Sequence, residues 1–242
     1  MPHKNPSDAT LVLLPGLDGT GDLFAPFLAA LPSRLATRVI DYPDRALSLE
    51  QLAEHTRSRL PEGKLVLLAE SFSGLVALTL LSRFHLPLTA IIFCVSFATS
   101  PRPWLVCAAK RRPIPRLLLR LATDPLLKYS CLGPQASAAQ IKLLRDTLGK
   151  VEPKTISQRL NLIDHFRPPL RKPLHLPCYY LQGSDDHLVP ARAADWFERH
   201  FSPFHLQQIT GPHFLLQANP GRCAAAVVSF LGSLNKFDNA SP

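Results

Sequence analysis

Short apolar runs alternate with stretches of helical periodicity along most of the chain. The runs suit buried strands, whereas the helical stretches repeat apolar residues every three to four positions. A capping-box pattern, Ser48 with Gln51, opens one helix. We expect strands at 10–14, 37–41, 64–68, 89–96, 178–181 and 204–209, and helices at 22–31, 49–60, 72–83, 191–201 and 220–234. Strands alternating with helices predict an α/β fold, a doubly wound and mostly parallel sheet.

The segment 100–169 interrupts this alternation. It is rich in proline and arginine, and its helical patterns lie at 116–122, at 137–148, where Gly149 would end the helix, and at 155–166. We interpret it as a helical cap inserted into a core formed by residues 1–99 and 170–242.

One predicted strand stops abruptly at Ala69-Glu70-Ser71-Phe72-Ser73-Gly74, and a helix begins at once. Such a sharp turn exposes the Ser71 side chain at the positive N-terminal end of a helix, as a nucleophilic serine requires. The pattern is a variant of G-x-S-x-G, with Ala69 and Ser73 where glycines usually stand. By itself it also fits an ordinary serine near a helix start.

Three further loops follow predicted strands and carry polar or glycine residues. The first, 15–21, is punctuated by glycines and lacks phosphate-loop spacing, so it can offer backbone N–H groups to a substrate oxygen. The second and third, 182–190 and 211–220, hold acids and His213. Because parallel strands end at one edge, these loops and Ser71 should meet there.

Taken together, the blocks L-P-G-L-D-G-T-G, A-E-S-F-S-G, G-S-D-D-H-L-V-P and G-P-H-F-L-L-Q-A-N-P resemble the α/β-hydrolase superfamily. The chain is most similar to its small bacterial serine esterases, including carboxylesterases and pimeloyl-carrier methyl esterases, from about residue 11 to 231. The resemblance implies that Ser71 is the nucleophile and His213 the general base. It also implies that the backbone N–H groups of Leu17 and Phe72 form the oxyanion hole and that no cofactor is needed.

The resemblance offers two neighbouring residues, Asp185 and Asp186, as the acid of the triad. Family spacing to the proline of the D-x-x-V-P stretch favours Asp186 over Asp185. Asp164 is a more distant candidate, since some relatives place the acid after an earlier strand. The other histidines fit surface or packing positions.

The basic excess is confined to the middle of the chain. The net charge is +9, but residues 101–172 hold fifteen basic and four acidic side chains, a net +11. The segment could be a solvated surface, a docking site for an acidic acyl carrier or coenzyme A, or a patch attracted to anionic membranes. Nucleic acid is disfavoured by the few aromatic residues and the lack of a motif. The arginines suited to phosphates are Arg111, Arg112, Arg116 and Arg120.

We therefore expect a cofactor-independent serine hydrolase that cleaves carboxylic esters through an acyl-enzyme. Candidate substrate-binding residues are Asp18, Trp104, Leu117, Leu118 and Leu144. A carrier-dependent acyl esterase or thioesterase, an acyltransferase, and a non-catalytic binding module with the same fold are the alternatives.

Two further features bear on location and chemistry. Five widely spaced cysteines suggest reduced, buried thiols and no disulfide framework, and no His, Cys or Asp cluster has metal-ligand spacing. The sequence shows no signal-peptide core or stretch long enough to span a membrane, so we expect a cytoplasmic protein.

Overall fold

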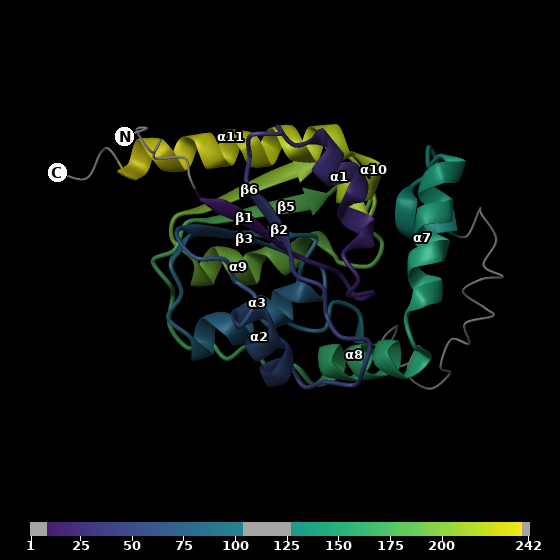
Figure 1. The fold of residues 1–242 in the computed structure, drawn as a ribbon, viewed down its shortest axis with the longest axis horizontal. Coiled ribbons are helices and arrows are strands. Elements are labelled where there is room, and N and C mark those ends of the chain that lie inside the picture. Colours follow the sequence, from purple (N-terminus) through teal and green to yellow (C-terminus); the bar gives the residue numbers. More distant parts are fainter. Residues whose placement is uncertain (1–8, 104–126, 239–242) are drawn as a thin grey trace.

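The apolar runs form a six-stranded sheet in which all neighbours are parallel (Figure 1). The computed structural model describes residues 9–103 and 127–238. The strand order is β2-β1-β3-β4-β5-β6. The strands are β1 Thr10–Leu14, β2 Thr37–Val39, β3 Leu65–Glu70, β4 Leu88–Cys94, β5 Cys178–Gly183 and β6 Phe204–Ile209. The predicted doubly wound α/β sheet is confirmed.

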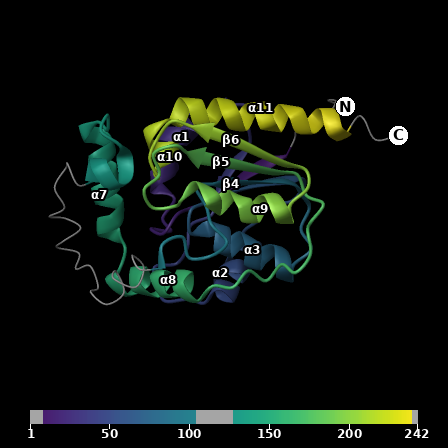
Figure 2. The same cartoon turned by 180° about the vertical axis from the view of Figure 1, so that it is seen from behind.

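Helices cover both faces of this sheet (Figures 1 and 2). Along β3, Leu65, Leu67 and Ala69 pack toward the face covered by α2, α3 and α9, whereas Val66 and Leu68 pack toward α1, α10 and α11. This alternation buries β3 completely. The helices are η1 Asp22–Phe24, α1 Ala25–Ala30, α2 Leu49–Arg57, α3 Ser73–Arg83, η3 Ala191–Ala193, α9 Ala194–His200, α10 Leu215–Ala218 and α11 Pro220–Asp238.

The segment between β4 and β5 contributes η2 Lys128–Leu132, α7 Ala138–Lys150 and α8 Pro153–His165. Figures 1 and 2 show α7 beyond the carboxyl ends of β5 and β6. It packs there in a small apolar cluster with Leu23, whereas Ile163 of α8 packs against the face that carries α2 and α3. The helix predicted at 116–122 lies outside the described residues.

Two expected boundaries differ from the structure in an instructive way. The helix expected to stop at Gly149 continues to Lys150, and Val151 and Glu152 are extended before Pro153 opens α8. Gly149 is accommodated in the last turn of α7, and Pro153 disfavours helical backbone at Glu152, so the two helices are separated by the extended residues 151 and 152. The strand expected at 64–68 continues to Glu70, so that β3 ends directly at Ser71.

The capping box expected at Ser48 is present, and a second one opens α7. Both arms of the capping boxes are present at α2, with Ser48 and Gln51, and at α7, with Ser137 and Gln140. Cys94, Cys131, Cys178 and Cys223 are free thiols, three of them buried, and Cys107 lies outside the described residues. Within residues 9–103 and 127–238, no helix is long and apolar enough to cross a membrane.

Candidate active site

Ser71 occupies a strained turn between β3 and α3. Its φ of 49° lies in the left-handed region, which residues other than glycine seldom adopt. The end of β4 holds both backbone groups of Ser71: its N–H donates to the Cys94 carbonyl at 2.9 Å, and its carbonyl accepts from the Ser96 hydroxyl at 2.7 Å. The turn presents the half-buried side chain at the carboxyl edge of the sheet.

Gly74 provides the close approach that this turn requires. A Cβ atom there would lie 2.0 Å from Oγ of Ser96, the hydroxyl that holds the Ser71 carbonyl. Ala69 and Ser73, which replace the usual glycines, are both fully buried, so the turn tolerates these small side chains.

His213 and Asp186 continue from Ser71 as a chain of hydrogen bonds. Nε2 of His213 lies 2.9 Å from Oγ of Ser71, and Nδ1 lies 2.8 Å from Oδ2 of Asp186. With the Nδ1 proton donated to the carboxylate, Nε2 is free to accept the serine proton. Three residues far apart in the chain thus form the arrangement of a nucleophile, a base and an orienting acid.

Asp186 is held in place by its own loop. Its second oxygen, Oδ1, accepts the N–H groups of Leu188 and Val189, each at 2.8 Å. Asp185 is exposed, and Asp164 lies on α8. Gly183 lets the loops after β5 and β6 approach closely, because a Cβ there would lie 2.7 Å from the Gly211 carbonyl oxygen.

The glycine-punctuated loop 15–21 follows β1 and lies beside the serine turn. The Ser73 hydroxyl donates to the Pro15 carbonyl and lies 2.5 Å from the Tyr42 hydroxyl, which therefore donates to it. Asp18 is buried and shapes the loop, since its carboxylate accepts both the N–H and the hydroxyl of Thr20. Leu17 lies in this loop, half-buried.

A second carboxyl, Glu70, is buried directly before Ser71. Burial raises the pKa of Glu70 to about 7, against the opposing effect of a hydrogen bond from Gln217. The Gln217 amide donates to Oε1 of Glu70 at 3.0 Å, and the N–H of Gly16 also hydrogen-bonds to this carboxyl. Glu70 thus joins the loop after β1 to the helix that follows His213.

The predicted substrate-binding residues fall in different places. Asp18 lies in the loop after β1, and Leu144 is fully buried on α7, in the cluster that contains Leu23. The remaining candidates lie outside the described residues: Trp104, Arg111, Arg112, Arg116, Leu117, Leu118 and Arg120.

Sequence reasoning did not find several polar residues around this site. Tyr42, Glu70, Ser96, Arg159 and Gln217 are all buried or nearly so, and each acts through a partner that is distant in the chain. The only available signal was a polar residue at an otherwise apolar position, as for Glu70 at the end of its strand. Such a residue reveals burial but not its partner.

Within the described part of the chain, no three His, Cys, Asp or Glu side chains are grouped so that they could hold a metal ion. The hydrogen-bonded serine, histidine and aspartate suit proton abstraction from the serine followed by nucleophilic attack.

We compared the chain with protein-family models, curated proteins and solved structures. No protein-family model and no curated protein matches the sequence. Solved structures do match. An esterase from Exiguobacterium antarcticum has a TM-score of 0.79 at 13% identity over 93% of this chain and 92% of that one.

Two further solved structures align over similar lengths. An esterase from Rhodococcus sp. ECU1013 has a TM-score of 0.77 at 19% identity, covering 95% of this chain and 92% of its own. The enol-lactonase from Burkholderia xenovorans LB400 has a TM-score of 0.73 at 16% identity, covering 96% and 94%. At these identities the likeness shows a shared fold.

Proposed function

We propose that this chain, which has the α/β-hydrolase fold, is a serine hydrolase that cleaves carboxylic esters. One observation carries the proposal: the hydrogen-bonded chain from Ser71 through His213 to Asp186 at the carboxyl edge of a parallel sheet. This edge is where open α/β folds place their sites, and the order Ser, Asp, His is typical of this fold.

In the first half of the reaction, Oγ of Ser71 attacks the acyl carbonyl carbon while Nε2 of His213 takes the hydroxyl proton. The carboxylate of Asp186 holds the imidazole in the required tautomer and stabilises its charged form. Collapse of the tetrahedral intermediate expels the alcohol, which receives the proton from His213. The acyl group remains on Ser71.

In the second half, water replaces the alcohol. His213 takes a proton from water as it attacks the acyl carbon, and returns that proton to Oγ of Ser71 as the acid leaves. An acyltransferase would use a second alcohol in this step with the same residues.

The oxyanion of both intermediates would be stabilised by the backbone N–H groups of Leu17 and Phe72. Phe72 lies at the N-terminus of α3, where the helix dipole favours negative charge. Leu17 lies in the loop that Ser73 holds beside the serine turn. Donors fixed in place before the reaction account for a large share of catalysis in such sites.

We further propose that residues 100–169 form a cap around the acyl chain of the substrate. If so, the core is formed by residues 1–99 and 170–242. The described helices of residues 100–169, α7 and α8, lie on the side of the molecule where the strands end (Figure 1), which suits a cap.

The test of the proposed function compares wild type, Ser71→Ala and, as a control, Ser184→Ala, which alters an exposed serine of the acid-bearing loop. The substrates are p-nitrophenyl esters of increasing acyl length. We expect Ser71→Ala to lower kcat by at least about a thousandfold, and Ser184→Ala to leave it unchanged. A fluorophosphonate probe should label only the two proteins that keep Ser71.

Retention of most activity in Ser71→Ala would overturn the assignment of the nucleophile. If folded wild-type protein neither hydrolyses esters nor reacts with the probe, the chain is a non-catalytic binding protein with this fold.

A second candidate is a carrier-dependent acyl esterase or thioesterase, favoured by the net charge of +11 in residues 101–172. An acidic carrier protein would be attracted to such a segment, with an effect that weakens as salt rises. Equal turnover of free and carrier-bound acyl esters, at low and high salt, would exclude this candidate.

A further inference from the structure

Arg159 is a buried arginine of α8 whose guanidinium reaches the loop after β1. The residue is 2% exposed. Nη1 donates to two consecutive carbonyl oxygens, at 2.8 Å to Leu17 and 2.6 Å to Asp18, and Nη2 donates to the Pro43 carbonyl at 3.3 Å. One side chain between β4 and β5 therefore binds the backbone of two loops in the first third of the chain.

The surroundings of the guanidinium are shaped to receive it. A Cβ on Gly19 would lie 2.4 Å from Nη1, so the glycine leaves the space that Arg159 occupies. Cζ of Arg159 lies 5.8 Å from the centre of the Tyr42 ring. Burial lowers the pKa of Arg159, but arginine keeps its charge at any accessible pH.

Tyr42 connects this contact to the serine turn. Its N–H donates to the Gly19 carbonyl at 2.7 Å, and its hydroxyl lies 2.5 Å from Oγ of Ser73, two residues after Ser71. The position of the guanidinium is thus linked to the turn that carries Ser71 by hydrogen bonds and packing.

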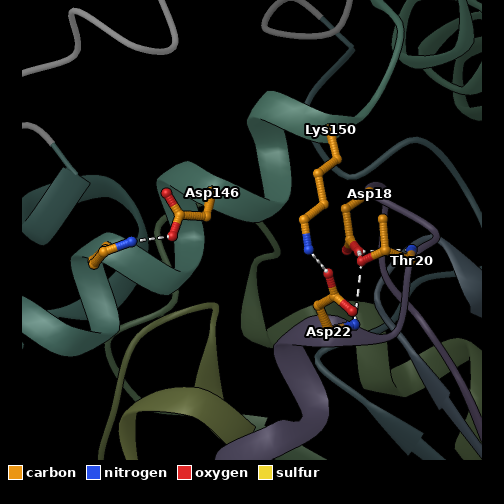
Figure 3. Close-up of polar contacts among 6 residues, drawn as sticks. Asp18, Thr20, Asp22, Asp146 and Lys150 are labelled. Atoms are coloured by element: carbon orange, nitrogen blue, oxygen red, sulfur yellow. Dashed lines mark hydrogen bonds and ion pairs between the residues drawn. The ribbon is translucent and has the colours of Figure 1, made fainter.

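A second, more exposed contact reaches the same loop. Lys150 of α7 pairs with Asp22, with 2.5 Å between Nζ and Oδ2. Figure 3 shows this ion pair together with the Asp22 N–H donating to the Thr20 hydroxyl and the Thr20 hydroxyl donating to Asp18. Both partners of the ion pair are well exposed, so this pair adds little stability. The buried Arg159 is the contact able to fix the loop.

We propose that Arg159 is a positioning residue that holds loop 15–21 in the conformation required for oxyanion stabilisation. The inference rests on the proposed function. Through Nη1, the planar fork of the guanidinium binds the carbonyls of Leu17 and Asp18 and so fixes the two peptide planes that follow residue 17. The Leu17 N–H, the proposed donor, belongs to the peptide plane directly before these two, so a shift of either plane would also move it. Oxyanion donors act only when they are fixed at hydrogen-bond distance from the developing charge.

The kinetic test compares Arg159→Met and Arg159→Lys with Arg171→Met, which removes an exposed arginine beyond α8. With a p-nitrophenyl ester, Arg159→Met should lower kcat about tenfold to a hundredfold and leave KM nearly unchanged. This fall in kcat is smaller than that caused by removing a direct oxyanion donor. Arg159→Lys, which keeps the charge without the fork, should recover part of the rate.

A trifluoromethyl ketone inhibitor separates oxyanion stabilisation from substrate binding. Its adduct with Ser71 carries an oxyanion, so its inhibition constant should rise in Arg159→Met by the same factor by which kcat falls. An unchanged inhibition constant, or a kcat equal to that of Arg171→Met, would overturn the proposal. If Arg159→Met does not fold, the same comparison is made with Arg159→Lys.

Amide hydrogen exchange gives a readout that needs no catalysis. Peptides covering residues 15–24 should exchange faster in Arg159→Met than in wild type, with no change around β5. Unchanged exchange in loop 15–21 would contradict the role of Arg159. If the wild type is inactive but its loop loosens in this variant, the proposed function fails and the structural role of Arg159 stands.

Discussion

Nδ1 of His213 lies 2.8 Å from Oδ2 of Asp186, whereas the neighbouring Asp185 is exposed. We expect Asp186→Asn to lower kcat/KM on an ester substrate by roughly 10⁴, because an amide at this position favours the wrong histidine tautomer. Asp185→Asn, the matched control, should change kcat/KM less than about threefold, as is usual for an exposed side chain away from the reacting groups. Steady-state kinetics of the two variants would check this. A greater loss of kcat/KM in Asp185→Asn than in Asp186→Asn would show that the assignment of the acid to Asp186 is wrong.

The buried carboxyl of Glu70 should make stability depend on pH. Burial raises its pKa from 4.5 to about 7, so between these values the folded protein keeps a proton that the unfolded chain has lost. Its contribution to stability is therefore greatest below pH 4.5 and falls by about 3 kcal/mol as pH rises to 7. Glu70→Gln, an uncharged analogue of the protonated acid, should lack this component.

Urea unfolding of wild type and Glu70→Gln between pH 5 and 8 measures that difference. The wild type should lose stability relative to the variant as pH rises, and parallel curves would contradict the prediction. Within the described residues no group hydrogen-bonds to Oε1 of Gln217, which makes this amide a ready partner for a protonated Glu70 after rotation.

Gly74 and Ser96 should behave as a coupled pair. In Gly74→Ala the new methyl group meets Oγ of Ser96 at 2.0 Å, and we expect a loss of about 1 to 3 kcal/mol in unfolding free energy. Ser96→Ala removes the bond to the Ser71 carbonyl and should cost about 1 kcal/mol. In the double variant much of the steric conflict disappears, so its loss of unfolding free energy should be smaller than the sum of the two single losses.

A double-mutant cycle by urea unfolding measures this coupling. Strictly additive losses would show that the Ser96 hydroxyl is not what excludes a side chain at position 74. Ester hydrolysis in the same variants should fall with Gly74→Ala, because displacing Ser96 loosens the turn that presents Ser71.

The repeating pattern of apolar runs and helical stretches was enough to predict the architecture. It placed β1 and β6 at their observed bounds and the other strands within a few residues. The central strands were marked by continuous apolar runs, because a strand buried on both faces must be largely apolar. It also placed Ser71, Asp186 and His213 after strands of one parallel sheet, which brings them to a common edge. The helix boundary at Gly149 was wrong, because glycine permits the end of a helix without enforcing it and α7 continues to Lys150.

By itself, then, the sequence determined the order of strands and helices, the serine turn and the loops that meet it. Only the tertiary structure brought Asp186, which motif spacing had favoured over Asp185, within 2.8 Å of His213, and only it showed that Arg159 binds the carbonyl of Leu17 in a loop 142 residues earlier. The physical reason is the range of the interactions: periodicity and turn chemistry act between residues close in the chain. Buried hydrogen bonds such as those of Glu70, Ser96 and Arg159 depend on distances that only the folded backbone sets.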